Sequence, residues 1–435
     1  MPGRSKPLTQ ATSYVRPRRL LLSLAIVLAT LAAATFAGRT PAVLGGARLI
    51  STGGFVRASG TQLYVGGTPW RFTGYNAYQT TSASPGYQCG GASSDAQLDQ
   101  LFAQMQNASG SIAMRTWFFQ SYMNGNTANF SQFDRVLTFA SAHGIRVIAT
   151  LVNQWTACDS GVGYKTASWY ASGYKSVESG HSLSYRDFAA LMAAHYRNDP
   201  RIAFWQLVNE AETKDVAGGG CAANGAALLR SFADDVAGVI KANDPNHLVS
   251  LGTMGGGQCG QVGPDYQYIH AGLIDICEIH DYHTSGTGTP PNDLASRLAQ
   301  CKALNKPLFI GETGLQNMTL AARASEFSNK LAALFGGGGA GFLIWSKHLA
   351  NDGGYAIGPG DPTEAVMLAE AQKLGGQGPI GGLIVTDGDP APNGSTPGAR
   401  VAGTHAPAAH GSASASPTAT LAAIPFSAWL LHRVR

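Results

Sequence analysis

Charged residues are scarce in this chain, and their signs nearly cancel. Lys, Arg, Asp and Glu make up 13% of the 435 residues. Of the 30 basic side chains, Arg4, Lys6, Arg16, Arg18 and Arg19 lie within residues 1–37, which leaves 25 to face 26 acidic ones. Proteins that bind nucleic acid need a basic surface against the phosphates, so this balance argues against a nucleic-acid partner. A polymer partner is expected to be uncharged.

Two common cofactor motifs are also missing. The six cysteines show no CxxC spacing, which argues against a zinc or iron–sulfur site. No Gly-rich phosphate loop follows the first predicted strand, where the sequence reads GYNAYQTT, so a dinucleotide-binding open sheet is disfavoured. We therefore expect no cofactor and no metal. Six cysteines are instead typical of disulfides formed in an oxidising compartment.

The N-terminus has the features of an export signal. Residues 1–37 contain a basic stretch, an apolar run from Leu20 to about Ala34, and small residues near Thr35 and Ala37 where a signal peptidase could cut. The alternative is an uncleaved anchor, because the apolar run is close to the roughly 18 residues that begin to span a bilayer. Either way we expect a secreted or cell-surface protein, with residues 38–54 as a linker.

The other end of the chain is predicted to be a disordered tail. Residues 376–435 are rich in Gly, Pro, Ala, Ser and Thr, a composition that buries too little apolar surface to fold. The final LAAIPFSAWLLHRVR is apolar but too short to span a membrane, so it gives loose surface association or has no role. Residues 55–375 remain as one large domain, expected to be a monomer.

Within this domain, short apolar runs alternate with helical patterns. The helical patterns include residues 94–106, 131–144, 184–197 and 226–242. The apolar runs are residues 69–76, 111–118, 146–153, 202–210, 247–253, 273–282, 307–313 and 339–347. Eight β/α units predict an α/β fold, a (β/α)8 TIM barrel, and residues 54–70 predict an N-terminal β-hairpin before it. A doubly wound sheet is the alternative fold.

Polar and aromatic residues gather at the ends of the predicted strands, where TIM barrels carry their catalytic groups. These residues are Tyr75, Asn76, Arg115, Trp117, Asn153, Trp155, Asn209, Glu210, His280, Tyr282, Glu312 and Trp345. One glutamate at a strand end is weak support, but two on separate strands indicate glycosidic bond hydrolysis. In that reaction one carboxylic acid protonates the leaving oxygen, and a second carboxylate attacks the anomeric carbon or activates water. The three tryptophans either offer flat faces to sugar rings or pack in the core.

The motifs WQLVNE, IHDYH and FIGETG, with MRTW and LVNQW upstream and LIWS downstream, resemble glycoside hydrolase family 5. Within that family they are most similar to the secreted β-mannanase-like branch, over roughly residues 55–375. The resemblance implies that Glu210 is the general acid/base and Glu312 the nucleophile. The other roles that it implies are a 2-hydroxyl contact for Asn209, ionisation of Glu312 by Arg115, orientation of Glu312 by Tyr282, a subsite wall at His280 and a sugar platform at Trp345.

The sequence also departs from that family. Ala211 follows Glu210 where the family often has proline, and Glu212 has no role in the family pattern, so we interpret it as a loop carboxylate rather than a substrate contact. The loops do not select a sugar. A β-mannan is favoured over a β-glucan as the polysaccharide or oligosaccharide substrate, while an exo-acting glycosidase or a cell-wall-glycan hydrolase remains open.

Two other classes of function are disfavoured. A carbohydrate-binding barrel without activity would lack one of the two glutamates, and both are present. A metal-dependent hydrolase built on His280, Asp281 and His283 is disfavoured because strand alternation turns Asp281 away from His280. Activity that survives excess chelator would separate a two-glutamate enzyme from the metal-dependent class.

Strand alternation gives further predictions. The alternation that points His280 into the barrel also points Glu278 inward, one layer deeper, and a buried carboxylate needs a partner. We expect Glu278 to pair with His280 or Arg115 and fix its orientation, or else to be satisfied by other core groups. Cys277 points outward and is predicted to pair with Cys301 on the following helix.

The positions of the remaining cysteines in loops predict the other two disulfides. Cys89 pairs with Cys158, and Cys221 with Cys259, because these cysteines lie in loops from near-neighbouring strands at the catalytic end.

Glu210 and Glu312, at the ends of the fourth and seventh strands, are expected to bring their carboxyl groups to about 5 to 5.5 Å, the separation of a retaining glycosidase.

Overall fold

The protein folds as a closed barrel of parallel strands. The structure is a computed structural model that describes residues 54–81, 89, 94–159 and 162–375. Within this part, eight parallel strands pair in the order β8-β7-β6-β5-β4-β11-β10-β9, and a parallel bridge between Ser250 and Ile276 joins the two ends of that order. The strands are β4 (Phe72–Asn76), β5 (Ala113–Trp117), β6 (Arg146–Thr150), β7 (Ile202–Gln206), β8 (Leu248–Ser250), β9 (Cys277–Asp281), β10 (Leu308–Thr313) and β11 (Gly341–Trp345). The predicted TIM barrel is confirmed.

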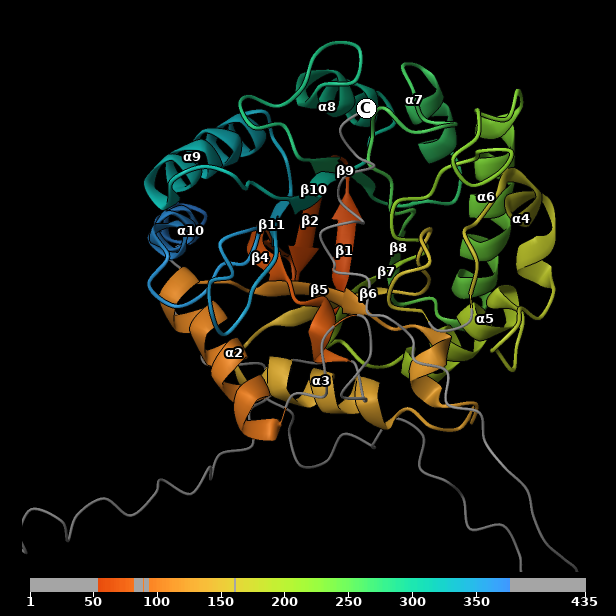
Figure 1. Cartoon of the computed structure of the whole chain (residues 1–435), viewed down its shortest axis with the longest axis horizontal. Coiled ribbons are helices and arrows are strands. Elements are labelled where there is room, and N and C mark those ends of the chain that lie inside the picture. Colours follow the sequence, from red (N-terminus) through yellow and green to blue (C-terminus); the bar gives the residue numbers. More distant parts are fainter. Residues whose placement is uncertain (1–53, 82–88, 90–93, 160–161, 376–435) are drawn as a thin grey trace, which may run out of the picture. The chain divides into compact units, whose positions relative to one another are not determined.

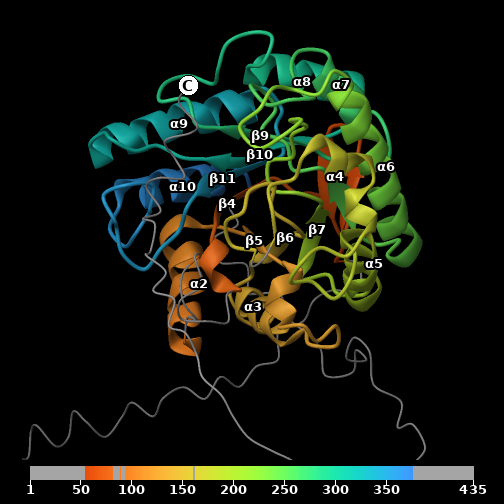
Figure 2. The ribbon, with the colours of Figure 1, turned by 45° about the vertical axis from the view of Figure 1, so that its right-hand side comes forward.

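Helices surround the strands (Figure 1). They are α2 (Asp95–Ser109), α3 (Ser131–Ala142), α4 (Ala167–Ala171), α5 (Tyr185–Tyr196), α6 (Gly225–Asn243), α7 (Asp265–His270), α8 (Leu294–Ala303), α9 (Leu320–Gly336) and α10 (Pro362–Lys373), with the 3-10 turns η1 (Tyr78–Thr80), η2 (Gln120–Met123) and η3 (Gly173–Lys175). The longest, α6, buries Leu229, Phe232, Val236 and Ile240, a spacing that places all four on one face. It packs beside α5 (Figure 2).

A short antiparallel sheet precedes the barrel, as expected for residues 54–70. Strands β1 (Val56–Ser59) and β2 (Gln62–Val65) form the hairpin, and β3 (Thr68–Pro69) pairs with β2. Val56 and Leu63 share a buried cluster with Phe72, Phe204 and Phe309 inside the barrel. These contacts are near the N-terminal ends of the strands, so the hairpin closes that end and the opposite end is left for chemistry.

The strands are shorter than the apolar runs that predicted them. The run at residues 202–210 forms a strand only as far as Gln206, because Leu207 N turns to Ser250 O at 2.9 Å while Asn209 N bonds Val152 O at 2.8 Å. Glu210 follows with φ +61°, in the left-handed region that non-glycine residues seldom adopt. Glu210 therefore lies in a loop just beyond β7 instead of at the strand's last position.

Three disulfides join the pairs expected from the sequence. Cys277 on β9 pairs with Cys301 on α8, with 6.3 Å between their Cα atoms. The other two bridges, Cys89–Cys158 and Cys221–Cys259, link loops, with Cα–Cα distances of 5.2 and 5.1 Å. The described helices include none that is long and apolar enough to cross a membrane. Residues 1–37 and 376–435, where the export signal and tail are predicted, lie outside the described residues.

Candidate active site

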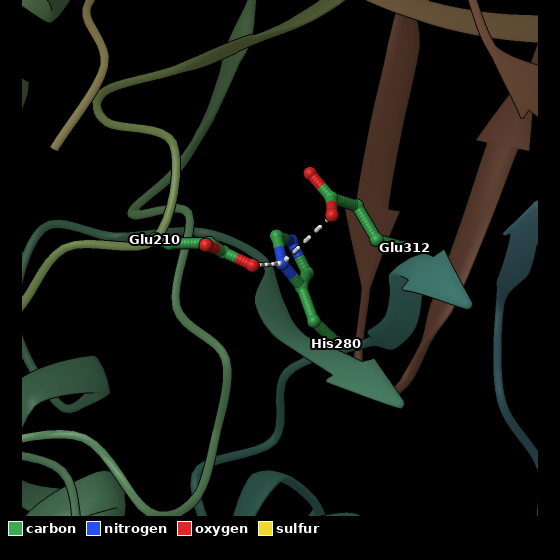
Figure 3. Close-up of side chains that lie close together, drawn as sticks. All are labelled: Glu210, His280 and Glu312. Carbon is green, nitrogen blue, oxygen red and sulfur yellow. Dashed lines mark hydrogen bonds and ion pairs between the residues drawn. The ribbon is translucent and has the colours of Figure 1, made fainter. Parts of the chain in front are cut away.

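Two glutamates face one histidine at the C-terminal end of the barrel. His280, on β9, lies between Glu210 and Glu312 (Figure 3). Its Nδ1 is 2.9 Å from Oε1 of Glu210 and 3.5 Å from Oε2 of Glu312. An oxygen of each glutamate and a histidine nitrogen all lie within 4.8 Å of one another, so the two carboxylates share one small space.

Glu312, on β10, is held at both oxygens. Arg115 Nη1 donates to Oε1 at 2.7 Å, and the hydroxyl of Tyr282 donates to Oε2 at 2.6 Å. The carboxylate is 1% exposed, and the guanidinium is fully buried. A buried carboxylate is tolerated when it is paired with a cation and hydrogen-bonded, and Glu312 has both kinds of partner.

Arg115 connects Glu312 to three other side chains. Its Nη1 also donates to Asn76 Oδ1 at 2.8 Å, Nη2 donates to Asn209 Oδ1 at 2.6 Å, and Nε donates to Gln206 Oε1 at 2.8 Å. Asn209 in turn donates from Nδ2 to Asn153 Oδ1 at 2.9 Å. A planar guanidinium with donors on three nitrogens fixes the relative positions of these groups.

Glu210 has a different environment. The indole Nε1 of Trp155 donates to Oε2 at 2.7 Å, and His280 occupies the other oxygen. The bonded partners of Glu210 thus include an indole and an imidazole, whereas Glu312 is bonded to the Arg115 guanidinium.

Glu278 lies beneath His280 and pairs with it, as alternation along β9 predicts. Its Oε1 is 3.3 Å from His280 Nε2 and accepts from Gln206 Nε2 at 2.5 Å, while Oε2 accepts from Ser250 Oγ at 2.6 Å. Glu278 is linked to Arg115 through the side-chain amide of Gln206, which bonds both residues. Gly311, in FIGETG, makes room for this carboxylate, because a Cβ there would lie 1.9 Å from Oε1 of Glu278.

His280 is surrounded by negative charge. Burial alone would lower its pKa, but the carboxylates of Glu312, Glu210 and Glu278 outweigh burial and raise the pKa of His280 to about 9. An imidazolium is therefore favoured at neutral pH. The groups that contact His280 thus stabilise a positive charge beside both glutamates.

The tryptophans differ in their surroundings. Trp155 is half-buried and bonds Glu210, whereas Trp117 is 1% exposed and lies against Phe119 and the Arg115 guanidinium. Trp117 therefore packs against Arg115 of the site, and its expected role as a sugar contact stays a prediction. Trp345 is 4% exposed, and Tyr78 stacks on it with centroids 5.0 Å apart, so its role as a sugar platform stays a prediction.

Gln206, a central residue of this network, was not predicted. Gln206 bridges Arg115 and Glu278, and the signal for it was a lone amide in an otherwise apolar, buried strand, which needs polar partners. Asn76 stood at a strand end but had no expected role, and it bonds Arg115. Glu212 accepts a hydrogen bond from Tyr164 in the loop, and it makes no contact with either Glu210 or Glu312 among the bonds of the described residues.

The described residues contain one group that could hold a metal ion, made of Glu210, His280 and Glu312. Its donor set of two carboxylates and one imidazole is compatible with zinc. A bound cation would compete with Arg115 and His280 for the same carboxylate oxygens and would force His280 to give up its proton. The alternative metal site, in which Asp281 would join His280, does not form. Asp281 instead bonds Lys330 at 2.7 Å and His283 at 2.8 Å, away from His280.

Comparison with known proteins identifies the family to which the chain belongs. The family model described as "Cellulase (glycosyl hydrolase family 5)" matches residues 72–349, more than half of the chain. The chain is 27% identical over 386 residues to a putative mannan endo-1,4-beta-mannosidase 9 of Oryza sativa, covering 75% of this chain and 88% of that protein. It is 26% identical over 312 residues to a probable mannan endo-1,4-beta-mannosidase F of Neosartorya fischeri, covering 61% of this chain and 63% of that protein.

The solved structures support the fold. An endo-1,4-beta-mannanase from Rhizomucor miehei superposes with a TM-score of 0.55 at 20% identity, covering 74% of this chain and 99% of that one. An endo-beta-1,4-mannanase from Thermotoga petrophila also gives a TM-score of 0.55, at 19% identity, covering 70% and 76% of the two chains. Together with the family match across the barrel, these likenesses place the chain in glycosyl hydrolase family 5.

Proposed function

We propose that the protein is a secreted glycosidase that cleaves β-linked mannan with retention of configuration. The observation that carries this proposal is the pair Glu210 and Glu312, whose oxygens lie within 4.8 Å of each other and of His280. Retaining enzymes hold their two carboxyl groups about 5 to 5.5 Å apart, whereas inverting enzymes leave a wider gap for water. The named activities of the relatives favour mannan as the substrate.

In the first step Glu312 attacks the anomeric carbon while Glu210 gives its proton to the departing oxygen. Arg115 and Tyr282, bonded to the two oxygens of Glu312, hold it ionised and aligned before the attack. The glycosidic bond breaks as an ester forms between Glu312 and the sugar. In the second step Glu210, now ionised, removes a proton from water, and the resulting attack on the same carbon releases Glu312.

The proton that Glu210 delivers is shared with His280. Oε1 of Glu210 and Nδ1 of His280 are 2.9 Å apart, close enough for a proton to pass between them. Glu278 accepts from Nε2 on the other side of the ring and keeps a proton there. His280 therefore keeps Nδ1 facing Glu210 in both steps of the reaction.

Export from the cytosol forms part of the proposal. Three disulfides connect parts of the barrel, and such bonds persist in oxidising compartments. The apolar run at Leu20–Ala34 would supply the signal.

The test is hydrolysis of mannan, glucomannan, cellulose and aryl β-glycosides, with products identified by chromatography. We expect cleavage of mannan and glucomannan, activity that persists in excess chelator, and a first product with the β configuration by proton NMR. Cleavage of cellulose alone would replace mannan with glucan as the substrate. A first product with the α configuration would overturn the retaining mechanism, and loss of activity on chelation would point to a metal at Glu210, His280 and Glu312.

A further inference from the structure

Glu212 stands two residues after Glu210 but faces different partners. In a regular strand, residues two apart point to the same side. Here the left-handed backbone at Glu210, with φ +61°, breaks that alternation. Glu210 turns to His280, whereas Glu212 accepts at Oε1 from the hydroxyl of Tyr164 at 2.5 Å. Lys214 Nζ lies 3.5 Å from the same oxygen, and the Glu212 side chain is 2% exposed.

Tyr164 links this carboxylate to the environment of Glu210. Its ring lies against Trp155, with centroids 5.6 Å apart and planes tilted by 57°. Trp155 in turn donates from Nε1 to Glu210 Oε2 at 2.7 Å. A continuous set of contacts therefore runs from Glu212 through two aromatic rings to the carboxylate that would act as the acid/base.

The backbone around these side chains is tied together at the same place. Gln154 N donates to Asn209 O at 3.1 Å, and Glu212 N donates to Gln154 Oε1 at 3.3 Å. Gln154 also donates from Nε2 to Lys165 O at 2.6 Å. The three segments that carry Trp155, Tyr164 and Glu212 are thus fixed relative to one another, so the orientation of the Tyr164 ring depends on its side-chain contacts.

We propose that Glu212 and Tyr164 are positioning residues that hold Trp155 against Glu210 and so keep Glu210 aimed at the leaving oxygen. The Glu212 carboxylate supplies the acceptor for the hydroxyl of the half-buried Tyr164, and partial burial raises the pKa of Tyr164 so that it stays a donor. Without that acceptor the Tyr164 ring is released, and the indole N–H loses its alignment with Oε2. This inference rests on the proposed acid/base role of Glu210.

The test compares two substrates that differ only in their need for acid. Unactivated manno-oligosaccharides need a proton on the leaving oxygen, whereas 2,4-dinitrophenyl β-manno-oligosaccharides of the same length do not. Comparing kcat/KM confines the measurement to the first chemical step. We expect Tyr164→Phe and Glu212→Ala to lower the ratio of unactivated to activated kcat/KM by about tenfold or more, part of the roughly 10²- to 10⁴-fold effect of general acid catalysis.

Two variants serve as controls. Glu212→Gln retains an acceptor for the Tyr164 hydroxyl and should keep the ratio near that of the unmodified protein. Tyr174→Phe removes a bond of the same kind, from the Tyr174 hydroxyl to Asp235 Oδ2 at 2.7 Å, away from Glu210, and should leave the ratio unchanged. Because a ratio is independent of the folded fraction, misfolding alone cannot produce the expected result.

The outcomes of this test separate the positioning role of Glu212 and Tyr164 from the proposed function. If Tyr164→Phe and Glu212→Ala change both substrates in equal proportion, or change neither, the positioning role is wrong while the proposed function stands. If the unmodified protein cleaves neither substrate, the proposed function fails instead.

Discussion

His280 Nε2 lies 3.3 Å from Oε1 of Glu278, a fully buried carboxylate that also accepts hydrogen bonds from Gln206 and Ser250. The other ring nitrogen of His280 faces Glu210 and Glu312. One imidazole thus contacts three carboxylates, and only the lower one, Glu278, is too deep to touch a substrate. Its negative charge acts on the reaction through His280.

Replacing Glu278 by glutamine should move the pH profile. The change removes one of the three carboxylates that raise the pKa of His280 to about 9, so this pKa should fall. We expect the alkaline loss of kcat/KM to occur at a pH lower by about one unit or more, the usual effect of a neighbouring charge. The measurement is kcat/KM on a soluble mannan between pH 4 and 10.

A control carboxylate is available on α10. Glu370 is also largely buried and bonds Lys373 at 2.9 Å, outside the barrel interior, so Glu370→Gln should leave the profile in place. If Glu278→Gln kept both its turnover and its pH profile, Glu278 would be a core residue without influence on the reaction.

The pKa of His270 is shifted downward, opposite to that of His280, and this shift predicts how the stability of the fold depends on pH. It is buried beside Tyr266, to whose carbonyl its Nδ1 donates at 2.7 Å, and burial lowers its pKa to about 4. In the unfolded chain its pKa is near 6.5. Neutral His270 therefore favours the folded state fully above pH 6.5, and this contribution is lost as the pH falls toward 4.

The variant His270→Asn tests this account, because asparagine can still donate to the Tyr266 carbonyl but does not titrate. The free energy of unfolding in urea, measured at pH 7 and pH 4, should fall less for the variant than for the unmodified protein, by up to roughly 3 kcal/mol. Equal decreases in both proteins would show that His270 does not contribute to acid sensitivity.

The barrel was predictable because its signals are local. Each strand is a short apolar run between turn residues, and strand alternation was enough to point Glu278 inward and Cys277 outward. The position of Glu210 was only partly predictable: its approach to Glu312 follows from the fold, but its left-handed backbone depends on how Leu207 and Asn209 bond to two neighbouring strands.

Partners that come from distant loops could not be read from the sequence. Tyr164 has ordinary sequence surroundings, and its role depends on which side chains meet it after folding. The place of Trp117 at a strand end was predictable, whereas its contacts with Phe119 and Arg115 were not. Strand-end position predicts that a residue is near the site but does not predict that it reaches the substrate.

The assignment of Glu210 and Glu312 to different roles predicts different behaviour for their alanine variants. Glu210→Ala removes the acid, so substrates that need a protonated leaving group should lose at least about 100-fold in kcat/KM. Dinitrophenyl glycosides should still form the ester with Glu312. Added azide should then take the place of the missing base and the water, and restore turnover with a β-glycosyl azide as product.

Glu312→Ala should be inactive toward both kinds of substrate, since no ester can form. Azide could only attack the sugar directly and would give the α-glycosyl azide. The configuration of the azide product, read by proton NMR, therefore identifies which glutamate is the nucleophile. An α-glycosyl azide from Glu210→Ala and a β-glycosyl azide from Glu312→Ala would reverse the assignment. Near-normal activity of either variant on mannan would rule out the two-glutamate mechanism, because each carboxylate is required in both steps.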